Sequence, residues 1–118
     1  MLETLQKIVD GTPGAKSALL MGFDGIVVEQ YTTPEAADTD FEAMAMEFSF
    51  RFIELREAAQ SLEMGTLNDI SVKAEYGTVL ARVLNEEFFL AMLLGEPGHM
   101  GKGRWMLRST ANDFLSQL

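Results

Sequence analysis

Cysteine is absent from this 118-residue sequence, and proline, histidine and basic residues are scarce. Without cysteine the chain can form no disulfide and no thiolate metal site, which fits an intracellular protein. The single histidine, His99, stands in a glycine-rich stretch with no visible orienting partner, so it predicts a surface residue rather than part of a triad or metal cluster. We therefore expect no catalytic residue, no metal site and no cofactor.

Positive charge is low as well. Nine Lys and Arg against 18 Asp and Glu give a formal charge of −9, and such a field repels nucleic acid and anionic membranes. No apolar run approaches the roughly 20 residues that a membrane-spanning helix needs. The N-terminus also lacks the basic and apolar regions of a signal peptide. These absences predict a cytoplasmic protein that neither binds nucleic acid nor inserts into a membrane.

The length predicts one domain over residues 1–118, built around one core. The longest regular pattern runs over residues 40–64 and predicts a single long helix with two apolar faces. Thr39 or Asp40 can cap its start, and Gly65 suits its end. At 3.6 residues per turn one apolar set falls on the same side of this helix, which we expect to pack on a sheet. The set comprises Phe41, Ala45, Phe48, Phe52, Leu55, Ala59 and Leu62.

A second apolar face lies almost opposite the first on this helix. A chain that buries the first face leaves the second pointing outward, where either another element of the chain or a partner protein must cover it. In the partner interpretation, Met46 adapts to an irregular surface and Phe50 supplies an anchor. The second face comprises Ala43, Met46, Phe50 and Ile53, and its charged neighbours, a polar rim or an ordinary solvated face, are Glu47, Arg51, Glu54, Arg56 and Glu57.

The other patterns predict two further helices and five strands. Asp24-Gly25 can form the tight turn of a hairpin, and residues 67–75 alternate as a half-exposed strand. Residues 88–94 are apolar on both faces, which predicts a strand in the middle of a covered sheet. We predict an α+β fold of order α-β-β-α-β-β-β-α, with a five-stranded, mainly antiparallel sheet. The long middle helix is expected on one face and the terminal helices on the other. The expected flanking elements are a helix at 2–9, strands at 18–21, 26–31 and 79–84, a loop at 95–103 and a helix at 105–118.

One of these strands has no protection against pairing with another chain. The strand at residues 67–75 carries Lys73, a residue that blunts exposed strand edges, whereas the strand at 26–31 carries neither Lys nor Pro. Pairing the latter across a twofold axis would give a closed symmetric dimer. The alternative is that another element of the chain covers it. The residues of this predicted dimer interface are Ile26, Val27, Val28, Glu29, Gln30 and Tyr31.

The glycine-rich segment before the last helix does not fit a phosphate-binding loop. Such a loop needs Gly where Glu96 stands and Ser or Thr where Gly103 stands, so both the close backbone approach and the magnesium ligand are missing. Lys102 and Arg104 lie near a helix N-terminus, which disfavours positive charge. They either pair with local carboxylates or bind an anion or an acidic partner, and the sequence does not decide between these options.

The order of elements resembles the roadblock family of dynein light chains and their bacterial and archaeal relatives. The resemblance is carried by the first hairpin at residues 18–28, by residues 76–84 with Leu93-Leu94, and by the glycine-rich segment at residues 100–104 before the last helix. Each piece alone is common, but their order and spacing extend over nearly the whole chain.

The resemblance implies a protein without chemistry of its own. Roadblock-like domains form dimers by pairing a strand of each subunit, with the long helices side by side, and those helices commonly receive a small Ras-like GTPase. This chain would then be a homodimeric regulator of such a GTPase. It could insert Arg51 or Arg56 beside the transferring phosphate, or it could hold the switch segments of the GTPase in the productive geometry. We favour the second mode. The alternatives are a scaffold or adaptor subunit with no effect on hydrolysis, and a small-molecule sensor that uses the sheet as a pocket floor.

Overall fold

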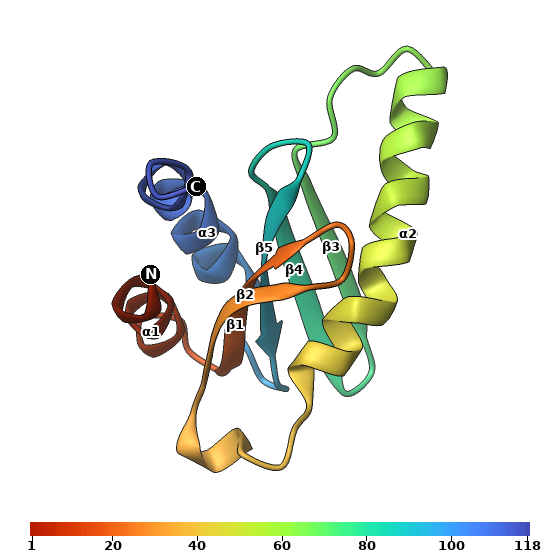
Figure 1. Cartoon of the computed structure of the whole chain (residues 1–118). Helices are drawn as coiled ribbons and strands as arrows, with labels where there is room; N and C mark the ends of the chain where they lie inside the picture. The colour runs from red at the N-terminus through yellow and green to blue at the C-terminus, as the bar shows by residue number, and fades with distance from the viewer.

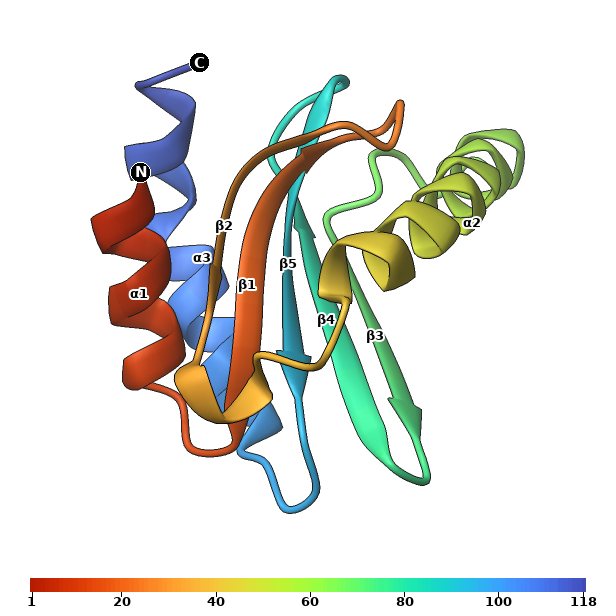
Figure 2. The same ribbon diagram turned by 60° about the horizontal axis from the view of Figure 1, so that its bottom comes forward.

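A central sheet separates two terminal helices from one long middle helix. The computed structural model describes residues 1–118, and the three layers are visible in Figure 1 and Figure 2. The predicted α+β fold, its element order and the placement of its helices are confirmed. The elements are α1 (Leu2–Asp10), β1 (Ala15–Gly22), β2 (Val27–Thr32), the 3-10 turn η1 (Pro34–Ala36), α2 (Phe41–Ser61), β3 (Asp69–Ala74), β4 (Gly77–Val83), β5 (Phe88–Leu94) and α3 (Met100–Leu115).

The sheet is antiparallel throughout, with strand order β2-β1-β5-β4-β3. The strand that is apolar on both faces, β5, occupies the centre, as its sequence predicted. The turn between β1 and β2 contains Gly25 at φ 85°, a left-handed conformation that glycine adopts without steric cost. The two outermost strands are therefore β2 and β3, and each has one side without a neighbouring strand.

Each face of the sheet carries its own hydrophobic cluster. Leu20, Leu80 and Met92 belong to the cluster of 12 buried residues under α1 and α3. Phe52 and Phe89 belong to the cluster of 11 buried residues under α2, where their rings pack edge to face at a centroid distance of 5.3 Å. Alternation along the strands thus supplies two cores rather than one. No helix is long and apolar enough to cross a membrane.

The long helix α2 begins at its predicted cap and ends before the predicted glycine. The carboxylate of Asp40 accepts a hydrogen bond of 3.1 Å from the backbone N–H of Ala43, which satisfies one of the free donors of the first turn. At the other end Glu63 takes a left-handed conformation with φ 58°, and its backbone N–H donates to the carbonyl of Gln60. Glu63 rather than Gly65 therefore takes the position that closes the helix.

The last helix, α3, begins at Met100, five residues before its predicted start at Trp105. The Nδ1 atom of His99 accepts a hydrogen bond of 3.0 Å from the backbone N–H of Lys102. This side-chain cap allows a glycine-containing segment to form the first turn. His99 is exposed, as predicted, and it has a structural role that the sequence analysis did not assign.

Two other predictions about packing and boundaries need correction. Leu55 and Leu62 were expected to face the sheet, but both are exposed. Leu55 lies in the C-terminal half of α2 and Leu62 follows its last residue, and neither side chain reaches the buried cluster. Strand β3 begins at Asp69 instead of residue 67, because the chain returning from α2 joins the sheet two residues later than the alternating pattern suggested.

Candidate protein-binding surfaces

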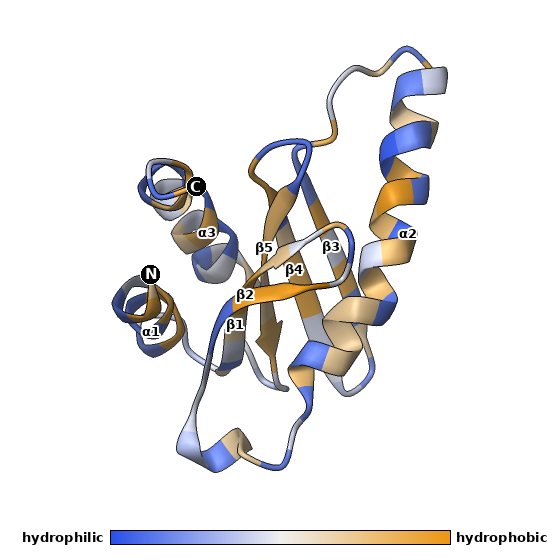
Figure 3. Ribbon diagram, in the orientation of Figure 1, coloured by the Kyte–Doolittle hydropathy of each residue, from blue (hydrophilic) through white to orange (hydrophobic).

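The outward face of α2 exposes two large apolar side chains. Met46 is 41% exposed and Phe50 is 47% exposed, and Ala43 is exposed beside them. Both side chains remain exposed, although Met46 lies beside the turn at Gly25, and Figure 3 shows hydrophobic residues on α2, which covers one face of the sheet. We refer to Ala43, Met46 and Phe50 as the outer face of α2. Its exposed apolar area is of the kind that marks protein-binding sites.

Ile53 does not belong to this face. The sequence analysis placed it there, but its side chain is half-buried and packs against the cluster under α2. On a helix of 3.6 residues per turn it follows the buried Ser49 by four positions, so it turns toward the sheet rather than directly away from it. The expectation that Ile53 points outward is wrong.

The charged residues around the outer face divide into free and constrained groups. Glu47, Arg51, Glu54 and Glu57 are exposed and make no ion pair within the chain. Arg56 is held in place, because its guanidinium lies 4.1 Å from the ring centroid of Phe23 and its Nη1 donates a hydrogen bond of 3.0 Å to the carbonyl of Glu86. This cation–π contact stabilises the folded chain and holds the Arg56 side chain in place. Arg51 is thus the only arginine of α2 that remains free.

Backbone groups on both outer strands face solvent. The N–H of Thr33 donates to the carbonyl of Lys16, and hydrogen bonding alternates along an antiparallel pair, so the N–H of Gln30 points away from β1. By the same reasoning, the bond from the N–H of Val83 to the carbonyl of Asn68 directs the N–H of Ser71 away from β4. Both edges can accept another strand.

The side chains of the predicted dimer strand lie on both sides of the sheet. Val27 packs on the cluster under α2 and Tyr31 on the cluster under α1 and α3. Val28 is exposed and Glu29 is half-buried, while the amide of Gln30 donates to the hydroxyl of Ser17. Ile26 lies in the turn, not in β2, and is 66% exposed. The strand therefore begins one residue later than predicted.

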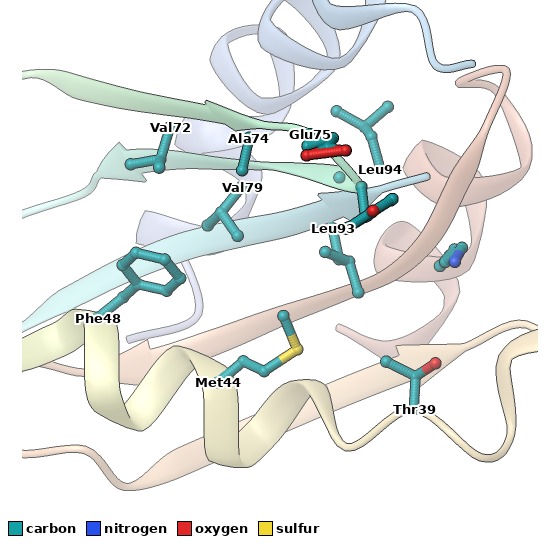
Figure 4. Close-up of a pocket in the computed structure, with 12 residues that line it drawn as sticks. Thr39, Met44, Phe48, Val72, Ala74, Glu75, Val79, Leu93 and Leu94 are labelled. Carbon is teal, nitrogen blue, oxygen red and sulfur yellow. The ribbon is translucent and has the colours of Figure 1, made fainter. Parts of the chain in front are cut away.

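An open apolar groove of about 450 Å³ runs between α2 and the strands β3, β4 and β5. Figure 4 shows Met44 and Phe48 of α2 directed toward Val72, Val79 and Leu93 across it. The volume falls within the range of small-molecule sites, so the cavity that the sensor hypothesis requires is present. This groove was not predicted from the sequence, although the alternation in β3 placed Val72 on the face of the sheet that α2 covers only in part.

No group of three or more His, Asp or Glu side chains lies close enough together to hold a metal ion. The features that stand out are instead surfaces. They are the outer face of α2, the free edges of β2 and β3, and the groove beside β3.

No protein-family model and no curated protein sequence matches the chain. Several solved structures do. MglC from Myxococcus xanthus is 34% identical, with 98% of this chain and 97% of that chain aligned and a TM-score of 0.71. A Roadblock/LC7 domain from Streptomyces avermitilis is 18% identical over 99% of this chain and 96% of the other, with a TM-score of 0.84. The gliding protein MglB from Thermus thermophilus is 18% identical over 92% and 81% of the two chains, with a TM-score of 0.82.

Proposed function

Because the chain belongs to the roadblock/LC7 family, we propose that it is a homodimeric, non-catalytic regulator that binds a small Ras-like GTPase. The single observation that carries this proposal is the outer face of α2, where Met46 and Phe50 are exposed on the helix that roadblock-like domains use for GTPases. Another solved structure that is similar to this chain, MglB with a tetrameric arrangement, supports self-association in proteins of this fold.

The energetics favour a dimer as the binding unit. Full burial of Met46 or Phe50 contributes about 1.5–3 kcal/mol each. Association costs at least about 4 kcal/mol in lost translational and rotational freedom, so one copy of this small face is a weak binding site. Two α2 helices lying side by side double the apolar area, and the surrounding Glu47, Glu54 and Glu57 supply a polar rim.

We propose that the chain acts by holding the switch segments of the GTPase rather than by inserting an arginine. Arg56 is committed to the ring of Phe23 and the carbonyl of Glu86, so only Arg51 could reach a partner. Arg51 lies in the middle of a helix, and a mid-helix side chain reaches a buried phosphate less readily than a loop residue does. Arg51→Ala should therefore leave most of the stimulation intact, whereas an inserted arginine is worth a factor of about 10³–10⁵ in hydrolysis.

The test is a pull-down from the source cytosol with this chain as bait, followed by GTP turnover of the GTPase it recovers. Phe50→Asp should abolish GTPase binding, because it places a charge in the centre of the contact. It should leave the fold unchanged, because the side chain of Phe50 is exposed. The control is Leu118→Asp, since Leu118 is 45% exposed and lies beyond the end of α3. Binding that survives Phe50→Asp would contradict the proposed site.

The scaffold alternative has its own outcome in the same experiment. A GTPase that binds tightly while its turnover stays unchanged would indicate anchoring. Recovery of large structural or adaptor proteins, with no GTPase among them, would indicate a scaffold subunit.

The small-molecule sensor is tested by a separate experiment. The absence of any hit in a thermal-shift screen of small apolar ligands would count against the sensor function of the groove.

The shared edge of the dimer can be assigned with two proline variants. Gln30→Pro and Ser71→Pro each remove one backbone donor that faces away from the sheet, and proline is tolerated at such edge positions. We propose pairing through β2, so Gln30→Pro should give monomers in light scattering and Ser71→Pro should not. The opposite result would assign the interface to β3, where Val72 and Phe48 beside the free edge offer an apolar surface for a second copy.

A further inference from the structure

Positive charge gathers on one side of this acidic molecule. Among its nine basic residues, five lie on α3, β3 or β4, and α3 itself carries a single acidic residue, Asp113. In contrast, α2 carries four glutamates against two arginines. Figure 2 shows that α3 and α2 lie on opposite sides of the sheet. The five basic residues are Lys73, Arg82, Lys102, Arg104 and Arg108.

An exposed tryptophan lies among these cations. Trp105 is 55% exposed on α3, and the Nζ atom of Lys102 lies 4.9 Å from the centroid of its ring. Arg104, Arg108 and Gly101 join Trp105 in lining a shallow surface hollow of about 290 Å³. Tryptophan and arginine are among the residues that are enriched at binding hot spots. We call Lys102, Arg104, Trp105 and Arg108 the α3 patch.

The charges of the α3 patch are only partly neutralised within the chain. One carboxylate, that of Asp69, serves two guanidinium groups, at 3.5 Å from Arg82 and 3.8 Å from Arg104. Lys102 and Arg108 have no carboxylate within 4.0 Å. The Nε atom of Arg82 is buried and has no hydrogen-bond acceptor. Exposed cations that lack partners on an acidic protein are poised to attract an anionic group.

We propose that the α3 patch binds an acidic segment of a partner protein, with an apolar side chain of that segment packed on Trp105. Its guanidinium groups match carboxylates in bidentate geometry. A short acidic segment extends over only the α3 patch, so it is attracted by the positive charges of the patch. An anionic membrane or a nucleic acid presents charge over a wider area and is repelled by the net charge of −9. The patch is separate from the outer face of α2, so it could be occupied while a GTPase is bound.

The protein contains one tryptophan, so its fluorescence reports directly on the patch. The probe is a synthetic peptide of glutamates around a central leucine, and its glutamine analogue is the control. The glutamate peptide should change Trp105 emission saturably and the analogue should not. Added salt should weaken this binding, since exposed charges are screened beyond about 8 Å at physiological ionic strength.

Two charge-reversal pairs then separate the patch from the overall charge. Arg104→Glu with Arg108→Glu should weaken peptide binding about tenfold or more. Lys7→Glu with Arg51→Glu produces the same net charge on exposed residues elsewhere and should change it less than about twofold. Arg104→Gln with Arg108→Gln provides a milder version if the first pair does not fold, as judged by circular dichroism.

Three results would overturn the proposal. The first is equal weakening by both reversal pairs, which would indicate only a general charge effect. The second is the absence of any emission change with the glutamate peptide. The third is saturable binding of phosphatidylserine vesicles or oligothymidylate in place of the peptide, which would assign the patch to a membrane or to nucleic acid. None of these results depends on GTPase binding, so the proposed function is tested separately.

Discussion

The two faces of the sheet bury almost equal clusters but are closed to different extents. Two helices, α1 and α3, cover one face, and Gly103 allows α3 to approach so closely that an added Cβ would lie 2.8 Å from Leu80 Cδ1. A single helix covers the other face and leaves a groove of about 450 Å³ beside β3. On this second face Met44, Phe50 and Leu55 remain exposed.

This difference separates stability from binding. A closed face leaves little apolar surface for a partner, whereas a face covered by one helix keeps apolar side chains available on both flanks of that helix. The closed side offers charge instead, in the α3 patch. The chain therefore presents an apolar binding surface and a cationic one on opposite sides of one sheet.

The largest effect is expected from removing an aromatic ring under α2. Phe52 is 1% exposed and packs against Phe48 and Phe89, so Phe52→Ala should lower the free energy of unfolding by about 3–5 kcal/mol. Phe50→Ala, on the outer face of the same helix, should change it by no more than about 0.5 kcal/mol. Urea denaturation measures both, and similar losses would mean that the outer face is part of the core.

A smaller loss is expected from enlarging the closest contact on the closed face. Gly103→Val forces side-chain atoms against Leu80 and Met92 and should cost about 1–3 kcal/mol. The matched control is Gly101→Val in the same helical turn, where an added Cβ would meet only the ring of His99 at 3.6 Å. Thermal unfolding of the two variants checks this prediction. An equal loss in both would show that helix propensity, rather than close packing, sets the result.

The smallest effects compare the caps of the two helices. Asp40→Ala removes the acceptor for the N–H of Ala43 and should cost about 1 kcal/mol. His99→Ala removes the corresponding acceptor at the start of α3, but α3 packs against both α1 and the strands β4 and β5, so its first turn should fray less. Amide hydrogen exchange of the first turns distinguishes the two. Greater exchange at α3 than at α2 would contradict the view that α1 and the sheet secure the closed face.

Residue patterns were sufficient to predict the fold. Alternation in β3, the apolar β5 and the Asp24-Gly25 turn each depend on neighbouring residues alone, so the order of elements and the central place of β5 could be predicted. The family prediction rested on that same order and is confirmed by the 34% identity to MglC.

Positions that depend on where one element ends against another could not be predicted. The helical period of α2 continues through Leu55 and Leu62, and no local signal shows that these side chains meet no core. Ile53 packs against the cluster under α2, and which side of this helix meets the sheet depends on the packing of the whole chain. The α3 patch was predicted only as Lys102 and Arg104, because the exposure of Trp105 depends on how α3 packs on the sheet and no local signal shows it.

The place of β5 in the sheet also determines when the molecule can be completed during synthesis. β1 pairs with β2 on one side and with β5 on the other, and β5 ends at Leu94. Until that residue has left the ribosome, the chain consists of two separate hairpins that are local in sequence and share no strand. The pairing of β1 with β5 closes a loop of about 70 residues, the kind of long-range contact that slows folding. A nascent chain interrupted before β5 would thus expose the inner edges of β1 and β4, which both pair with β5 in the folded protein.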